Sequence, residues 1–235
     1  MSNFPSLKRR RLVSTRSNLQ AVLFDMDGTL VDTEGLWWQA AEEEAARLGL
    51  TLGDQDVPDV LGQAVEHTAS YLYGRCNGVR SEESIAAALD ARFVELVSHQ
   101  VVPLPGALEL LDGLAEAGVA TALVSASPRH VVDLVLDALG RRRFKTSFAA
   151  GETPLTKPAP DPYLAAVEAL GASPESCVAV EDTPTGVASA EAAGVAVVAV
   201  PSLTPILPGP GRAVVRSLLD VDLSLLQGLL ESPAA

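Results

Sequence analysis

The chain has 235 residues, of which 48% are hydrophobic and 20% charged, proportions typical of a globular protein that buries a full core. The formal net charge of -13 argues against a nucleic-acid partner, because affinity for a phosphate backbone comes mostly from Lys and Arg. Two cysteines are too few for a disulfide framework, and no run of about 18 apolar residues predicts a membrane span, so we expect a cytoplasmic protein without a membrane partner.

The first 18 residues are polar and basic, and they include the run Lys8, Arg9, Arg10 and Arg11. No apolar stretch of the kind found in signal peptides follows this run, so we predict a flexible basic tail over residues 1–18. The chain then turns apolar at 21–24 and stops abruptly at Asp-Met-Asp-Gly. A short apolar run that ends in polar residues predicts a buried strand leading into a loop.

The next segment, 34–102, has helical periodicity throughout and no convincing buried strand. We therefore expect a helical insert between the first and second strands of a sheet. The insert is acidic, with twelve Asp and Glu residues against Arg47, Arg75, Arg80 and Arg92. Pro103 and Pro105 mark its end, because proline disfavours a helical conformation in the residue before it.

Beyond the insert, strand and helix patterns alternate. Apolar runs at 119–124, 177–180 and 195–200 predict strands, and helical patterns lie at about 107–116, 128–139, 160–170 and 185–193. Alternation of this kind is typical of a parallel sheet with helices on both faces. The sequence thus predicts a doubly wound α/β core formed by 19–33 and 103–235, interrupted by the insert at 34–102.

Polar residues follow three of the predicted strands. Asp25, Asp27 and Thr29 come after the first strand, Ser125 after the second, and Glu181 and Asp182 after the strand at 177–180. Ligands of open parallel sheets lie outside the carboxyl ends of the strands. Two carboxylates 4 Å apart repel by about 4 kcal/mol at an effective dielectric constant near 20, so this cluster needs a cation. Hard oxygen ligands favour Mg²⁺.

Lys157 is one of only three lysines and precedes the helix predicted from 160. Phosphoryl transfer through an aspartyl-phosphate requires a carboxylate nucleophile, an acid or base, a hydroxyl, an ammonium group and metal ligands, and the sequence offers all of them. The residues therefore point to phosphate-ester chemistry, whereas Lys157 alone would fit a surface position equally well.

Four ordered motifs carry a resemblance to a known family. The segment 25–34, Asp-Met-Asp-Gly-Thr-Leu-Val-Asp-Thr-Glu, resembles the first motif of the haloacid dehalogenase-like superfamily, in its phosphatase and β-phosphoglucomutase-like branch. Ser125 matches the second motif, Lys157 the third, and Glu-Asp-Thr-Pro-Thr-Gly at 181–186 the fourth. The resemblance covers about 19–220. It implies a magnesium-dependent phosphatase that acts on a small phosphorylated metabolite, such as a sugar or polyol phosphate, beneath a helical cap at 34–102.

The resemblance also implies a role for each matching residue. Asp25 would attack phosphorus and bind the metal, and Asp27 would act as general acid and then base, with its carbonyl as a further metal ligand. Asp182 and Glu181 would complete the metal site. The phosphoryl group would be held by the remaining four residues, Thr29, Ser125, Ala126 through its amide, and Lys157.

Other activities fit less well. Dehalogenases of the superfamily attack carbon and need neither Asp27 nor Asp182, and phosphonoacetaldehyde hydrolases use a cap lysine, which 34–102 lacks. A β-phosphoglucomutase-type mutase shares all four motifs and stays an alternative. Such mutases tend to carry a cap lysine and an Arg-x-x-Ser pattern, and neither occurs at 62–68, which favours a hydrolase. A catalytically silent binding module is the alternative from another class, although no motif residue is lost.

Overall fold

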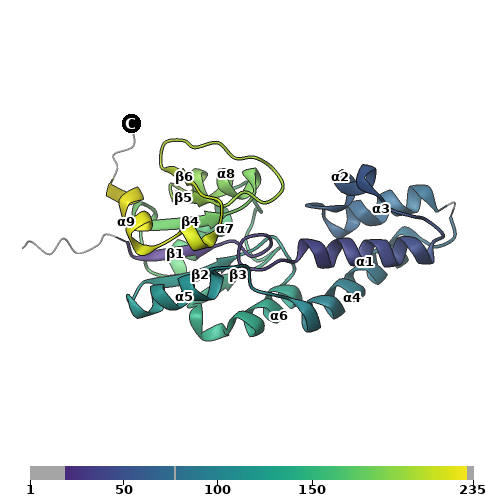
Figure 1. Ribbon diagram of the computed structural model, residues 1–235, viewed down its shortest axis with the longest axis horizontal. Coiled ribbons are helices and arrows are strands. Elements are labelled where there is room, and N and C mark those ends of the chain that lie inside the picture. The colour runs from purple at the N-terminus through teal and green to yellow at the C-terminus, as the bar shows by residue number, and fades with distance from the viewer. Residues whose placement is uncertain (1–18, 77, 232–235) are drawn as a thin grey trace, which may run out of the picture.

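The computed structural model describes residues 19–76 and 78–231, so the basic run predicted as a tail lies outside the described residues. Within this part the chain forms one parallel sheet in the order β3-β2-β1-β4-β5-β6, with helices on both faces (Figure 1). The strands are β1 (Ala21–Phe24), β2 (Ala120–Val124), β3 (Thr146–Phe148), β4 (Cys177–Glu181), β5 (Ala196–Ala199) and β6 (Arg212–Val214). The predicted doubly wound α/β fold is confirmed.

The central strands are apolar on both sides because helices cover both sides. Val22 and Phe24 of β1 pack with α5 (Ala107–Glu116), α6 (Arg129–Leu139) and α9 (Leu223–Glu231) in one core cluster. Ala21 and Leu23 face the other way, toward α7 (Asp161–Ala169) and α8 (Pro184–Ala192). Alternate residues of a strand point to opposite faces, so a strand buried on both faces must be apolar throughout.

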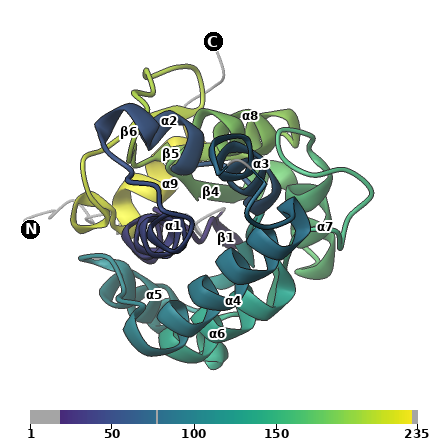
Figure 2. The same ribbon diagram turned by 90° about the vertical axis from the view of Figure 1, so that its right-hand side faces the viewer.

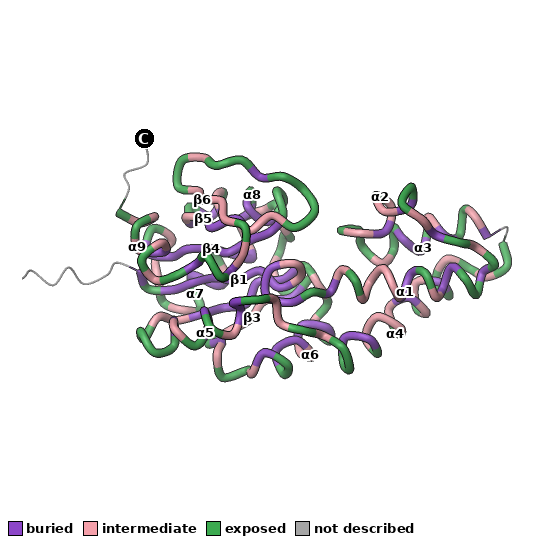
Figure 3. The backbone as a smooth tube through the Cα atoms, in the orientation of Figure 1, coloured by how far each residue is buried: buried purple, intermediate pink, exposed green. Residues whose placement is uncertain are grey.

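The insert is helical, as expected, over its described residues. It contains α1 (Glu34–Arg47), the short helices η1 (Asp54–Asp56) and α2 (Val57–Val60), then α3 (Val65–Arg75) and α4 (Glu82–Gln100). These helices bury their own apolar cluster, against which Trp37 and Trp38 pack. Figure 2 views the molecule from the insert, and Figure 3 shows buried positions in both the sheet and the insert.

Two long helices join the insert to the rest of the molecule. The first, α1, runs from the sheet toward the far end of the insert, and α4 runs back beside it and also packs along α6 (Figure 1). The chain leaves the sheet after β1 and returns beside Val31, which bridges Pro103. The insert is thus suspended above the carboxyl end of β1. Its division from the core at residues 34 and 102 remains our interpretation of this arrangement.

Several described elements were not predicted from the sequence, namely two edge strands, the last helix and the short helices η2 (Arg141–Arg143), η3 (Pro174–Ser176) and η4 (Leu218–Asp220). The edge strands β3 and β6 are three residues long and only half-buried, and α9 packs its Leu226 under the sheet. The remaining bounds of strands and core helices agree with the predicted patterns to within two residues. No helix in the described part of the chain has the length and apolar character to cross a membrane.

Candidate active site

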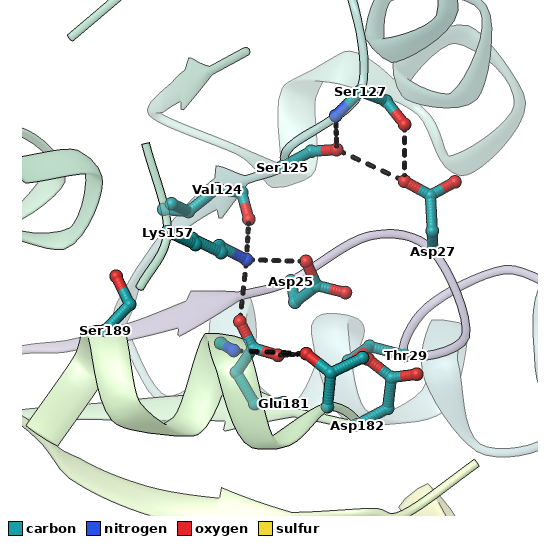
Figure 4. Close-up of polar contacts among 12 residues, drawn as sticks. Asp25, Asp27, Thr29, Val124, Ser125, Ser127, Lys157, Glu181, Asp182 and Ser189 are labelled. Atoms are coloured by element: carbon teal, nitrogen blue, oxygen red, sulfur yellow. Dashed lines mark hydrogen bonds and ion pairs between the residues drawn. The ribbon is translucent and has the colours of Figure 1, made fainter. Parts of the chain in front are cut away.

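The candidate site lies where the order of the strands reverses. After β1 the chain continues through β2 and β3 on one side, and then crosses back to place β4 on the other side of β1. The loops that follow β1, β2 and β4 therefore meet at one edge of the sheet. In open α/β sheets this crevice is where ligands bind, and Figure 4 shows polar side chains from all three loops converging there.

Asp25 is the first residue after β1, and its carboxylate contacts a buried lysine. Lys157 Nζ lies 2.7 Å from Asp25 Oδ1, 2.6 Å from Glu181 Oε1 and 2.9 Å from the carbonyl oxygen of Val124. These three acceptors use all three donors of the ammonium group. Burial alone would lower the pKa of Lys157, but the charges of Asp25 and Glu181 outweigh burial and raise it, so the lysine stays charged.

Three carboxylates face one another at the bottom of the site. Oxygen atoms of Asp25, Glu181 and Asp182 all lie within 4.8 Å of one another, and all three residues are buried. Glu181 also accepts a hydrogen bond of 2.6 Å from the hydroxyl of Tyr163. Lys157 supplies one positive charge against three carboxylates, so the cluster keeps negative charge that a bound cation would neutralise.

Asp182 shows the effect of this imbalance most clearly. Among the described residues, two hydroxyls donate hydrogen bonds to its carboxylate, Thr29 Oγ1 at 3.3 Å and Ser202 Oγ at 2.6 Å. Burial, followed by the charge of Asp25, raises the pKa of Asp182 to about 8. A bound cation would reverse this shift by favouring the carboxylate form. The donor set of oxygens fits a hard cation such as Mg²⁺.

Two glycines leave space for these carboxylates. A Cβ atom at Gly28, whose φ is +76°, would lie 2.3 Å from Asp182 Oδ2, and one at Gly186 would lie 2.0 Å from the carboxylate of Glu181. Gly186 is in the first turn of α8. Its amide donates a hydrogen bond to the hydroxyl of Thr183, the residue that precedes the helix. A larger residue at either position would collide with an acidic side chain of the site, so both positions require glycine.

Asp27 lies apart from this cluster and is surrounded by hydroxyl groups. Thr33 donates to Asp27 Oδ1 at 2.6 Å, while Ser127 and Ser125 lie 2.7 Å and 3.2 Å from Oδ2. Desolvation and the charge of Asp25 raise the pKa of Asp27, although the three hydroxyls oppose the shift by stabilising the carboxylate. The arrangement favours a proton on Asp27 at higher pH than an ordinary Asp would hold one.

A cavity of about 530 Å³ opens above these residues, between the core and the insert. Its core side includes Asp25, Asp27, Ala126, Lys157 and Asp182, and its insert side includes residues of α1, α3 and α4. Ser125 and Thr29 are buried beneath this lining. The structure thus brings all eight residues expected from the sequence to one region, with the Thr29 hydroxyl directed at Asp182.

Four polar neighbours of the site were missed by sequence reasoning. Thr33 and Ser127 bind Asp27, Tyr163 binds Glu181, and Ser202 binds Asp182. Ser127 had a signal, because it is the second hydroxyl in Ser-Ala-Ser after the predicted strand. Tyr163 and Ser202 had none, since their positions depend on how α7 and the loop after β5 fold back.

This fold and site are those of an enzyme. Burying a lysine and several carboxylates at the crevice of a parallel sheet costs stability, and such groups are typical of catalytic sites. The chain belongs to the haloacid dehalogenase-like hydrolase family, whose model matches residues 19–194. The resemblance seen in the four motifs is thereby confirmed.

Comparisons with known proteins agree with this assignment. The chain is 34% identical over 194 residues to hexitol phosphatase B of Escherichia coli, covering 81% of this chain and 87% of that protein. It is 37% identical over 196 residues to the protein CbbY of Rhodobacter capsulatus, covering 78% and 86% of the two chains. A crystal structure of CbbY from Rhodobacter sphaeroides in complex with phosphate superposes with a TM-score of 0.74 at 26% identity, covering 88% of this chain and 99% of that one.

Proposed function

We propose that this hydrolase is a magnesium-dependent phosphatase for small phosphomonoesters of sugars or polyols. The observation that supports the proposal most directly is the Asp25 carboxylate, held by Lys157 beside Asp182 at the floor of the cavity. The similarity to hexitol phosphatase B supports a polyol or sugar as the group that carries the phosphate. The substrate would be a small phosphorylated metabolite, and the setting cytoplasmic, in keeping with two buried free cysteines.

The proposed reaction proceeds in two displacements at phosphorus. An oxygen of Asp25 forms a bond to phosphorus while the bond from phosphorus to the ester oxygen breaks, and Asp27 gives its proton to the leaving oxygen. Water then attacks the aspartyl-phosphate, and Asp27 takes the proton from that water. Inorganic phosphate leaves, and the Asp25 carboxylate and protonated Asp27 are restored. The raised pKa of Asp27 supports its role as the acid.

The other residues would hold the phosphoryl group and the metal. Lys157, Ser125, the amide of Ala126 and Thr29 are proposed to contact phosphoryl oxygens. Asp25, Asp182, Glu181 and the carbonyl of Asp27 are proposed to hold Mg²⁺, which supplies positive charge that offsets the phosphoryl oxygens and the carboxylates. The insert is proposed to act as a cap that excludes water during the first displacement.

A mutase that returns the phosphoryl group to a sugar is the second candidate, because it would use the same motifs. A mutase must retain an intermediate that carries two phosphates. Among the described residues that line the cavity, Lys157 is the only Lys or Arg, and it belongs to the core. This supports a hydrolase.

Incubation with β-glucose 1-phosphate and Mg²⁺ separates the two candidates. We expect inorganic phosphate, no large activation by glucose 1,6-bisphosphate, and phosphate release from several other small phosphomonoesters. Formation of glucose 6-phosphate much faster than phosphate would assign a mutase instead. A full rate in excess chelator would refute the dependence on magnesium.

A further inference from the structure

The insert contributes an acidic wall to the cavity. Three carboxylates line it from three different helices, Glu34 from α1, Glu66 from α3 and Asp90 from α4. Asp90 Oδ1 lies 3.3 Å from Nε2 of His130 on α6, a contact that orients this carboxylate at the boundary between insert and core. In this wall the described lining residues include no Lys, Arg or His.

The four arginines of the insert are all committed elsewhere. Arg47 and Arg80 pair with Glu44, which is fully buried, and Arg75 pairs with the buried Asp56. Arg92 contacts Glu43 and Glu95, with distances of 2.7 Å and 2.8 Å. None of the four lines the cavity, and withdrawing Arg75 toward a ligand would cost the buried Asp56 its ion pair. Among the described residues of the insert, no Lys or Arg therefore belongs to the cavity lining.

The same wall contains an apolar surface and an amide. Trp37 and Phe93 meet edge to face with ring centroids 5.3 Å apart, and the indole Nε1 of Trp37 is occupied by the carbonyl oxygen of Val60, at 2.8 Å. Gln63 also lines the cavity. Aromatic faces pack against C–H groups, whereas carboxylates accept hydrogen bonds from hydroxyls. This combination matches a carbon chain that carries several hydroxyls.

We propose that the wall formed by Glu34, Glu66, Asp90, Trp37 and Phe93 selects phosphomonoesters whose leaving group is uncharged and rich in hydroxyls. A second phosphate or a carboxylate on the leaving group is rejected by the wall. This inference rests on the proposed phosphatase function and adds which leaving groups the enzyme accepts. The carboxylates bind leaving-group hydroxyls and repel a second anion, while Lys157 and the metal site take the single phosphate. Discrimination by repulsion is a recognised source of specificity.

The test compares sorbitol 6-phosphate, phosphoglycolate and fructose 1,6-bisphosphate as substrates of the full chain with Mg²⁺. For the wild-type enzyme we expect kcat/KM to be highest for sorbitol 6-phosphate. The variants Glu66→Gln and Asp90→Asn should each raise kcat/KM for phosphoglycolate about fivefold and lower it for sorbitol 6-phosphate, since each removes one repelling charge. Glu42→Gln is the matched control, because Glu42 is exposed on α1 and does not line the cavity.

Salt provides a readout that a change of shape would not give. Electrostatic rejection weakens as the Debye length falls, so the preference for sorbitol 6-phosphate over phosphoglycolate should narrow in about 0.5 M KCl. Equal or greater kcat/KM for the anionic esters, with no change in either variant, would overturn the inference and leave the phosphatase intact. Absence of phosphate release from every ester would instead overturn the proposed function, and this specificity with it.

Discussion

Lys157 and Asp25 form an ion pair of 2.7 Å in which the lysine side chain is 6% exposed and the aspartate side chain 10%. The same ammonium lies 2.6 Å from Glu181, the last residue of β4. A single lysine thus links the residue that follows β1 to the end of the neighbouring strand. It positions the proposed nucleophile and offsets the charge of two carboxylates that would otherwise face each other without compensation.

Replacing this lysine should cost both activity and stability. We expect Lys157→Met to lower kcat by about 10³-fold, since it removes a preorganised positive charge at the reacting group. The free energy of unfolding should fall by about 3–5 kcal/mol, because two buried carboxylates lose their partner. Steady-state kinetics and urea denaturation measure the two effects, with exposed Lys145→Met as the control. A kcat within tenfold of wild type would show that Lys157 is not required.

Asp182 should make stability depend on pH when metal is removed. Its pKa rises from 3.8 to about 8 on folding, so between these values the folded state binds more protons than the unfolded state. The free energy of unfolding therefore falls as pH rises through this window, by at most about 1.4 kcal/mol per pH unit. Asp182→Asn should remove this component of the slope in chelator, and Mg²⁺ should stabilise the wild type far more than the variant.

Urea denaturation at about pH 5 and about pH 8, with chelator and with Mg²⁺, tests this account. The exposed Asp32→Asn serves as the control, because it removes a carboxyl group that lies outside the metal cluster. Equal pH slopes for wild type and Asp182→Asn in chelator would contradict the assignment of this residue to a cation site.

Gly186 allows a comparison between two helical glycines. At Gly186 a Cβ would lie 2.0 Å from the Glu181 carboxylate, which cannot retreat because Lys157 and Tyr163 hold it. We expect Gly186→Ala to destabilise the protein by about 1–3 kcal/mol and to reduce Mg²⁺-dependent activity. Gly113 in α5 has nothing within 4 Å of its Cβ position, so Gly113→Ala should stabilise by about 0.5–1 kcal/mol. Similar melting temperatures for the two variants would contradict this reasoning.

Thr33 should tune the acidity of Asp27. Its hydroxyl donates to Asp27 and favours the carboxylate, so Thr33→Val should raise the pKa of Asp27 further. The acid form would then persist to higher pH, and the alkaline limb of kcat/KM should move in the same direction. A pH profile of kcat/KM measures the shift. Ser98→Ala removes a hydroxyl from an exposed residue of α4 that does not line the cavity, and should leave the limb in place. A downward shift for Thr33→Val would refute the role of Asp27 as acid.

The sequence predicted the centre of the sheet and the floor of the site more fully than their surroundings. Apolar runs followed by Asp, Ser or Glu are strong local signals, because a buried strand must be apolar and its carboxyl end must be polar to serve a ligand. The strands β3, Thr-Ser-Phe, and β6, Arg-Ala-Val, carry no such signal, since edge strands are half-buried. Ser202 and Tyr163 reach the site through tertiary folding alone. The ion pairs of the four arginines of the insert likewise could not be predicted, because they depend on how its helices pack.

We propose that Asp25 carries the phosphoryl group during turnover. Borohydride reduces an acyl phosphate, so quenching the enzyme during turnover of a phosphomonoester with borohydride and digesting it tests the claim by mass spectrometry. We predict homoserine at position 25 of the wild-type enzyme. No homoserine should form when substrate is omitted or in the Asp25→Asn variant. An unmodified Asp25 under turnover conditions, or reduction at Asp27 or Asp182 instead, would contradict the account.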